Sequence, residues 1–280
     1  MNENVKYILA PILIVMVYCF GHGSLFLTGN ETSFIFVLLS CLSIEYFINK
    51  AEHEDVYLRP IAGIDAMEEA VGRATEMGKS VLYVPGISGL DQVDTLSGLI
   101  ILGHTAGMTA KYEADLHVPV ASPIVMETAK ESCKESYLRE GRPDLYKEDM
   151  VHYVTDDQFA YAAGVNGIML REKPAAVFYQ GRFYAESLIL AETGNSIDAI
   201  QIAGTGSASQ IPFFVTACDY TLIGEEFFAA SAYLSKKSEL IGSIKGQDMI
   251  KVICMVSICL VVIATLFNMD VSQFFRMELG

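Results

Sequence analysis

Tryptophan is absent from the 280-residue chain, and cysteine and positive charge are both scarce. The 19 Lys and Arg residues stand against 34 Asp and Glu residues, which gives a formal net charge of −15. Nucleic-acid binding needs clustered Lys and Arg to neutralise phosphates, so the charge argues against that class of partner. The six cysteines contain no Cys-x-x-Cys pair, which argues against a zinc site or a disulfide framework and fits a reducing compartment.

Apolar residues are abundant, at 52% of the chain, and three segments are long and predominantly apolar: residues 7–27, 33–48 and 250–269. A transmembrane helix needs roughly 20 apolar residues, which the first and third segments supply. The second is shorter and carries Glu45. A cleaved signal peptide is the alternative for the first segment, but the run is long and no small-x-small cleavage site follows it. We therefore predict three transmembrane helices, of which the first two form a hairpin.

Lys and Arg lie close to these spans on one side, at Lys6, Lys50 and Arg59 and again before residue 251, and none lies in the 28–32 turn. The positive-inside rule then places residues 51–248 in the cytoplasm and the C-terminal tail outside. The predicted organisation is a transmembrane hairpin at 1–50, a cytoplasmic domain at 51–248, and a third helix with a short tail at 249–280. This predicts a multi-pass protein of the cell membrane.

Within the middle segment, six short apolar runs alternate with stretches of helical spacing. The strands are expected at 81–84, 116–120, 152–154, 175–179, 200–203 and 220–223. Such alternation predicts an α/β fold, a Rossmann-like parallel sheet of about six strands with helices on both faces. Residues 242–247 are interpreted as a linker back to the membrane.

Ligands of such folds bind beyond the carboxyl ends of the strands. Small and polar residues follow every predicted strand there. The candidates at these ends are Ser88, Asp156, Asp157, Gln180, Arg182, Gly204, Gly206, Ser209, Glu225 and Glu226.

The turn after the fifth predicted strand is similar to a dinucleotide-binding fingerprint. It runs Gly204-x-Gly206-x-x-Ser209, and Glu225 lies 19 residues beyond Gly206, where a ribose-binding acid would be sought. Glycines let a backbone approach a pyrophosphate, and a helix N-terminus attracts anions. No lysine lies nearby, so the turn is not a P-loop. The alternative is a tight strand-to-helix turn without a ligand.

The other strand ends suggest two more kinds of site. Ser88 lies in a sequence that is close to a nucleophile elbow, but Leu90 breaks the G-x-S-x-G pattern and no histidine is expected at this edge, so a helix-capping role is favoured. Asp156, Asp157, Glu225 and Glu226 could gather to hold Mg²⁺ or Ca²⁺. Helix dipoles favour the same acids without a ligand, so we predict no metal site. Arg182 could pair with these acids or hold an anionic ligand.

Four blocks of sequence are distinctive, at residues 59–86, 155–165, 185–195 and 217–226. Together they resemble a family of prokaryotic membrane-anchored proteins of unknown function. The resemblance implies membrane attachment and carries no activity, cofactor or catalytic residue. The first hypothesis is a membrane-tethered binding or assembly module that forms a homo-oligomer or serves another membrane or cytoplasmic protein. The alternative is an enzyme or sensor that binds a nucleotide-like molecule at residues 204–209.

Overall fold

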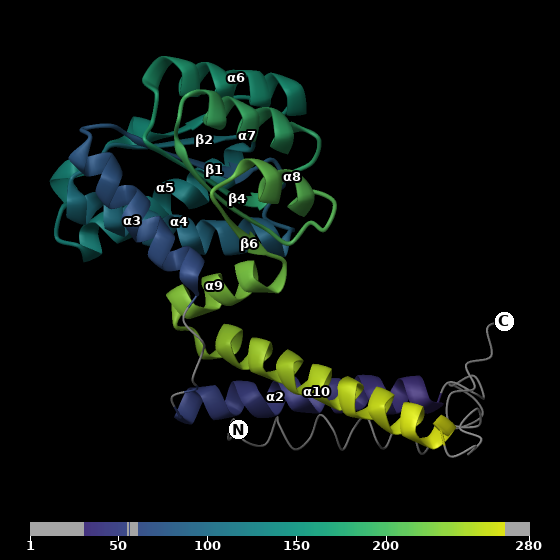
Figure 1. The fold of residues 1–280 in the computed structure, drawn as a ribbon. Helices are drawn as coiled ribbons and strands as arrows, with labels where there is room; N and C mark the ends of the chain where they lie inside the picture. Colours follow the sequence, from purple (N-terminus) through teal and green to yellow (C-terminus); the bar gives the residue numbers. More distant parts are fainter. Residues whose placement is uncertain (1–30, 55, 57–60, 267–280) are drawn as a thin grey trace. The chain divides into compact units, whose positions relative to one another are not determined.

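The computed structural model describes residues 31–54, 56 and 61–266 of the chain (Figure 1). The chain divides into two units: residues 1–58 with 236–280, and residues 59–235. The first predicted span, residues 7–27, lies outside the described residues.

The second unit is built on a parallel sheet of six strands in the order β3-β2-β1-β4-β5-β6. The strands are β1 (Val81–Gly86), β2 (Leu116–Val120), β3 (Val151–Tyr153), β4 (Ala176–Arg182), β5 (Ile200–Thr205) and β6 (Tyr220–Ile223). The predicted Rossmann-like parallel sheet is confirmed, because consecutive strands extend outward from β1 in one direction and from β4 in the other.

Helices cover both faces of this sheet, as predicted (Figure 1). On one face lie α3 (Ala62–Glu76), α4 (Val93–Tyr112), α5 (Pro123–Arg139) and α9 (Glu225–Ser235). On the other face lie α6 (Gln158–Glu172), α7 (Glu186–Ser196) and α8 (Ile211–Ala217). Two short 3₁₀ helices, η1 (Pro143–Leu145) and η2 (Glu148–Met150), lead into β3.

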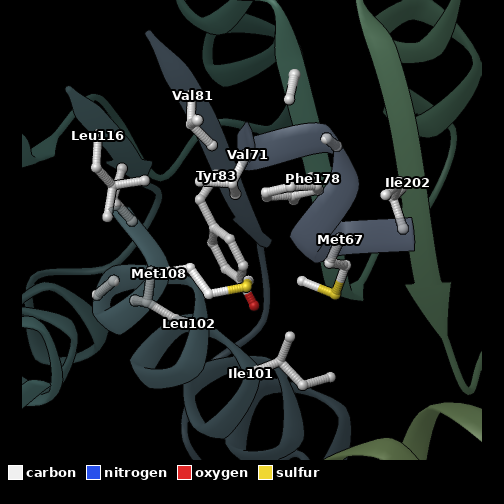
Figure 2. Close-up of a cluster of buried hydrophobic side chains, with 14 of the residues drawn as sticks. Met67, Val71, Val81, Tyr83, Ile101, Leu102, Met108, Leu116, Phe178 and Ile202 are labelled. Carbon is white, nitrogen blue, oxygen red and sulfur yellow. The ribbon is translucent and has the colours of Figure 1, made fainter. Parts of the chain in front are cut away.

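The core on the α3 and α4 face shows why the strands are apolar on both sides. Alternate residues of a strand point to opposite faces, so Val81 and Tyr83 of β1 lie in one core and Leu82 and Val84 in the other. Figure 2 shows the first core, where strand side chains meet residues of α3 and α4. The Tyr83 hydroxyl donates a hydrogen bond of 2.5 Å to the carbonyl of Gly98, which satisfies its buried polar atom.

Three strands run further than predicted. β1 continues through Gly86, β4 through Arg182 and β5 through Thr205. The ladder explains the extensions, because Gly86 pairs with Arg182 and Gln180 pairs with Gly204. The residues expected to form loops therefore belong to the sheet. Helix α8 begins at Ile211, two residues after Ser209.

The first unit contains two antiparallel helices, α2 (Glu31–His53) and α10 (Ser238–Leu266) (Figure 1). A side chain at Gly242 would approach the Cα of Ile48 to 2.3 Å, and one at Gly246 would approach the Cα of Ile44 to 2.5 Å. Small residues four apart let two helix backbones come this close, as in membrane helix pairs. The predicted linker at 242–247 is therefore wrong: those residues are helical and form the contact with α2.

Among the described residues, one helix is long and apolar enough to cross a membrane, spanning Ser238–Ile263. Large apolar side chains from Met249 onward are exposed on it. The predicted third span, residues 250–269, falls largely on this helix, which starts earlier than predicted.

Candidate functional site

The carboxyl edge of the sheet, where all six strands end, contains a topological switch point between β1 and β4. The chain leaves β1 towards α4 on one face and leaves β4 towards α7 on the other. In open parallel sheets this divergence creates the crevice in which ligands bind. The structure places Ser88, Gln180 and Arg182 here, beside Gln92 and Asp94, which the sequence did not single out.

Three glycines bring backbones close together at the switch point. A Cβ added at Gly86, whose φ is +84°, would lie 2.4 Å from the carbonyl oxygen of Arg182. One at Gly181 would lie 2.2 Å from the Pro85 carbonyl oxygen, and one at Gly98 would lie 2.3 Å from that of Gln180. These glycines therefore serve the packing of β1, β4 and α4 against one another.

The glycine turn after β5 also contacts the protein itself. The Gly206 N–H donates a 2.8 Å hydrogen bond to Oδ1 of Asp94, a residue in the first turn of α4 that is 8% exposed. In the dinucleotide fingerprint, such an amide would face a phosphate. Ser209 is exposed, and its hydroxyl lies 3.2 Å from that of Ser207. The contacts therefore match a tight strand-to-helix turn, and nucleotide binding there stays a prediction.

Arg182 is held by an amide rather than by the predicted acids. Its guanidinium donates to Oε1 of Gln92, whose Nε2 donates to Asp91 at 2.7 Å. Buried Gln180 donates from Nε2 to the Ile202 carbonyl at 3.0 Å. Among the described residues, Nε of Arg182 and Oε1 of Gln180 have no hydrogen-bond partner. This network crosses from β4 to β5 and to the loop that follows β1.

The four acids considered for a metal site are not brought together. Asp156 and Asp157 follow β3, whereas Glu225 and Glu226 open α9 after β6, and these two strands are opposite edges of the sheet. Five strand spacings separate them, about 24 Å. Asp157 caps α6 by accepting the Ala160 N–H at 2.8 Å. Within the described part of the chain, no group of three or more His, Cys, Asp or Glu could hold a metal ion.

Within residues 61–235, the histidines that a hydrolase could use lie away from Ser88. Its carbonyl accepts a 3.3 Å hydrogen bond from Thr95, and the residue that precedes α4 is Gln92, so the predicted capping role is wrong. His117 and His152 lie near the amino ends of β2 and β3, as predicted, and His104 lies within α4.

A second polar cluster, missed by the sequence reasoning, joins the starts of α6, α7 and α8. Glu186 is fully buried and accepts hydrogen bonds from Nε2 of Gln158 at 2.6 Å and from the Tyr184 N–H at 2.9 Å. The Ser187 hydroxyl donates to Oε1 of Gln210 at 2.5 Å. In the sequence, each of these polar residues lies near the start of a helical stretch. That position does not distinguish a helix cap from a buried residue that links two helices.

Burial keeps one tyrosine and two cysteines of the α/β unit protonated at neutral pH. Burial raises the pKa of Tyr161, the Glu186 carboxylate raises it further, and its hydroxyl donates to the Pro119 carbonyl at 2.8 Å. Burial raises the pKa of Cys133 and of Cys218 to about 12, so both thiols stay protonated at neutral pH. All five cysteines in the described residues are free.

Two clefts, each of about 190 Å³, lie away from the carboxyl edge. One lies beside the amino end of β2 and is lined by residues that include Asp115, His117 and Lys147. The other lies between α3, α4 and α5 near Glu68 and His104. Both are smaller than the roughly 300 Å³ at which small-molecule pockets begin.

The comparison with protein families decides how the chain is classified. The family described as "Domain of unknown function (DUF6754)" matches residues 21–275. The chain belongs to this family. No curated protein and no solved structure matches the sequence. The description of this family names no ligand and no reaction. A function for the carboxyl edge must therefore be inferred from its geometry.

Proposed function

We propose that this DUF6754 protein is a membrane-tethered α/β module for binding or assembly, and that it forms a homo-oligomer. The observation that carries this proposal is the close backbone packing at the switch point. Gly86, Gly181 and Gly98 bring backbones together where a Rossmann-like enzyme would hold a ligand. Close backbone packing at this place leaves less room for a ligand and favours a role for the surface of the domain.

The tether is supported by α10. Its side chains remain uncovered by protein over several turns, with Val256 52%, Ile258 64% and Leu260 61% exposed. A continuous apolar surface of this kind is costly in water and stable in lipid. The proposal includes three spans, at 7–27, 33–48 and 250–269, with the α/β unit in the cytoplasm. A topology reporter fused after Gly280 should then be external, and one inserted near Gly141 cytoplasmic.

The alternative, a nucleotide-binding enzyme or sensor at residues 204–209, rests on the glycine pattern alone. The amide of Gly206 already donates to Asp94, and a carboxylate at that position repels an incoming phosphate. We therefore place it second.

Native mass spectrometry of the full chain, extracted in an uncharged detergent, tests both readings because it reports subunit number and bound mass together. We expect a homo-oligomer without a bound nucleotide. A strictly monomeric mass in detergent and in lipid nanodiscs would contradict the assembly role. A stoichiometric extra mass of nucleotide size, together with a higher melting temperature on adding that nucleotide, would establish the alternative.

A further inference from the structure

Three exposed aromatic side chains stand at the starts of three neighbouring helices. Phe159 in the first turn of α6 is 58% exposed, Tyr184 just before α7 is 46% exposed, and Phe213 in the first turn of α8 is 39% exposed. All three lie at the carboxyl edge on the same face of the sheet, because α6, α7 and α8 cover one face and follow the ends of β3, β4 and β5. We call these three residues the aromatic rim.

Hydrogen bonds between the helix starts hold the rim together. Gln158, next to Phe159, donates to Glu186 of α7, and Ser187 of α7 donates to Gln210, which precedes α8. These hydrogen bonds are 2.6 Å and 2.5 Å long, and both bind α7 to a neighbour at its first turn. The buried polar cluster therefore fixes the positions from which the rim side chains project.

The rim is not needed to fill the core. Phe183 and Phe214, the chain neighbours of Tyr184 and Phe213, are fully buried, and their ring centroids lie 5.3 Å apart. Each pair thus contributes one inward and one outward aromatic residue. Clustered exposed aromatic residues mark interaction surfaces, and Tyr in particular is enriched where partners bind.

Charge identifies the kind of partner. The segments that carry the rim, residues 154–165, 183–194 and 206–217, contain four acids and no Lys or Arg. Asp156, Asp157 and Glu192 are exposed, whereas Glu186 is buried and hydrogen-bonded to Gln158. Arg182, just before the second segment, is half-buried and bonded to Gln92. An anionic lipid surface or a second copy presenting the same acidic rim would be repelled, whereas a cationic partner would be attracted.

We propose that the aromatic rim docks a cationic amphipathic segment of another protein, with apolar side chains on Phe159, Tyr184 and Phe213 and Lys or Arg beside Asp156 and Asp157. This rests on the proposed function as a binding module and names the partner's chemistry. An amphipathic helix that lays its apolar side on a hydrophobic surface is a common mode of peptide recognition.

The test is a titration of the full chain in uncharged detergent with a synthetic helical peptide of Leu and Lys, about 18 residues or five turns long. Empty micelles provide the blank. A peptide with Glu in place of every Lys provides the charge control. We expect the Leu and Lys peptide to bind, and Phe159→Ser and Phe213→Ser each to weaken its affinity about tenfold or more, as loss of an interface anchor does. The Leu and Glu peptide should not bind.

Leu170→Ser is the matched control, because Leu170 is 56% exposed and lies near the other end of the same helix as Phe159. It should leave the affinity unchanged, and all three variants should keep the wild-type melting temperature. Equal binding by the rim variants, or equal binding of the two peptides, would overturn the proposal. So would rim variants that become monomeric without losing peptide affinity, since the occupant would then be a second copy. None of these readouts depends on the bound mass that tests the proposed function, so the two proposals fail separately.

Discussion

Helices α4 and α10 are both long and apolar, yet protein covers one of them and not the other. In α4, 14 of the 20 residues are buried against the sheet and neighbouring helices. In the most apolar window of α10, 6% of the residues are buried. Hydropathy measures what a helix would gain by leaving water, and it does not say whether protein or lipid provides the cover.

Polar residues do not separate the two helices either. In α4, the hydroxyl of Thr105 donates to the Ile101 carbonyl at 3.0 Å, and that of Thr109 donates to the Ala106 carbonyl at 3.0 Å. In α10, the Ser257 hydroxyl donates to the Ile253 carbonyl at 2.8 Å. A helix that satisfies its hydroxyls on its own carbonyls suits a protein core and a lipid bilayer equally. Only the neighbours of a helix show which environment it occupies.

The sharpest way to test this contrast is to truncate one leucine in each helix. Leu102 of α4 is fully buried in the core (Figure 2), whereas Leu260 of α10 is 61% exposed. Leu102→Ala leaves a cavity, so we expect it to lower the free energy of unfolding of the α/β unit by about 3 kcal/mol. Leu260→Ala should change it by less than about 0.5 kcal/mol. Thermal unfolding of both variants in detergent measures the difference, and similar losses would show that α10 is part of a protein core.

A great deal of the α/β unit could be predicted from the sequence. Its strands are short apolar runs bounded by Gly, Pro or acids, and its helices show apolar periodicity, so local patterns locate the elements. The ranges predicted for β4 and β5 are too short, because Gly181 and Gly204 favour a turn when they are considered in isolation. Pairing with neighbouring strands keeps both glycines in the sheet. Pairing depends on neighbouring strands, which a local pattern does not contain.

The candidate site was less accessible to sequence reasoning, because strand order decides which loops meet. Asp156 and Glu225 follow similar strands in sequence and lie at opposite edges of the sheet. Asp94 and Gly206 are 112 residues apart and hydrogen-bonded. The glycines at 242 and 246 suggested a linker, since glycine is a common loop residue, and the close approach of α2 gives them a different role.

Two glycine-to-alanine substitutions on the α4 side of the sheet should have opposite effects. At Gly98 of α4, an added methyl group would lie 2.3 Å from the Gln180 carbonyl oxygen, which belongs to the sheet and cannot move freely. We expect Gly98→Ala to cost about 2 kcal/mol of unfolding free energy. At Gly72 of α3, nothing lies within 4 Å of the new methyl group. Gly72→Ala should stabilise the unit by about 0.5 kcal/mol, because alanine favours a helix.

Chemical denaturation of the two variants beside the wild type would measure both effects. A loss at Gly72 would indicate that alanine is unfavourable in these helices for a reason other than contact. Equal stability of Gly98→Ala and the wild type would show that α4 does not lie as close to β4 as its contacts indicate.

The smallest effect concerns pH, and it again separates α4 from α10, because α10 contains no histidine. Burial lowers the pKa of His104 below its usual value of about 6.5, and Arg139 lowers it further, whereas Glu68 and Glu140 raise it. Unfolded His104 therefore binds a proton at a higher pH than folded His104. Its contribution to stability is constant above the unfolded pKa, declines as the pH falls through about 6.5, and levels off below the folded pKa.

The wild type should lose stability between pH 7.5 and pH 5.5. In His104→Gln this loss should be smaller by less than about 1 kcal/mol, because solvent screens a half-buried group. His152, whose pKa is also lowered, should account for part of the remaining slope. Denaturation curves at the two pH values test this, and an unchanged slope in His104→Gln would show that α4 does not bury this imidazole.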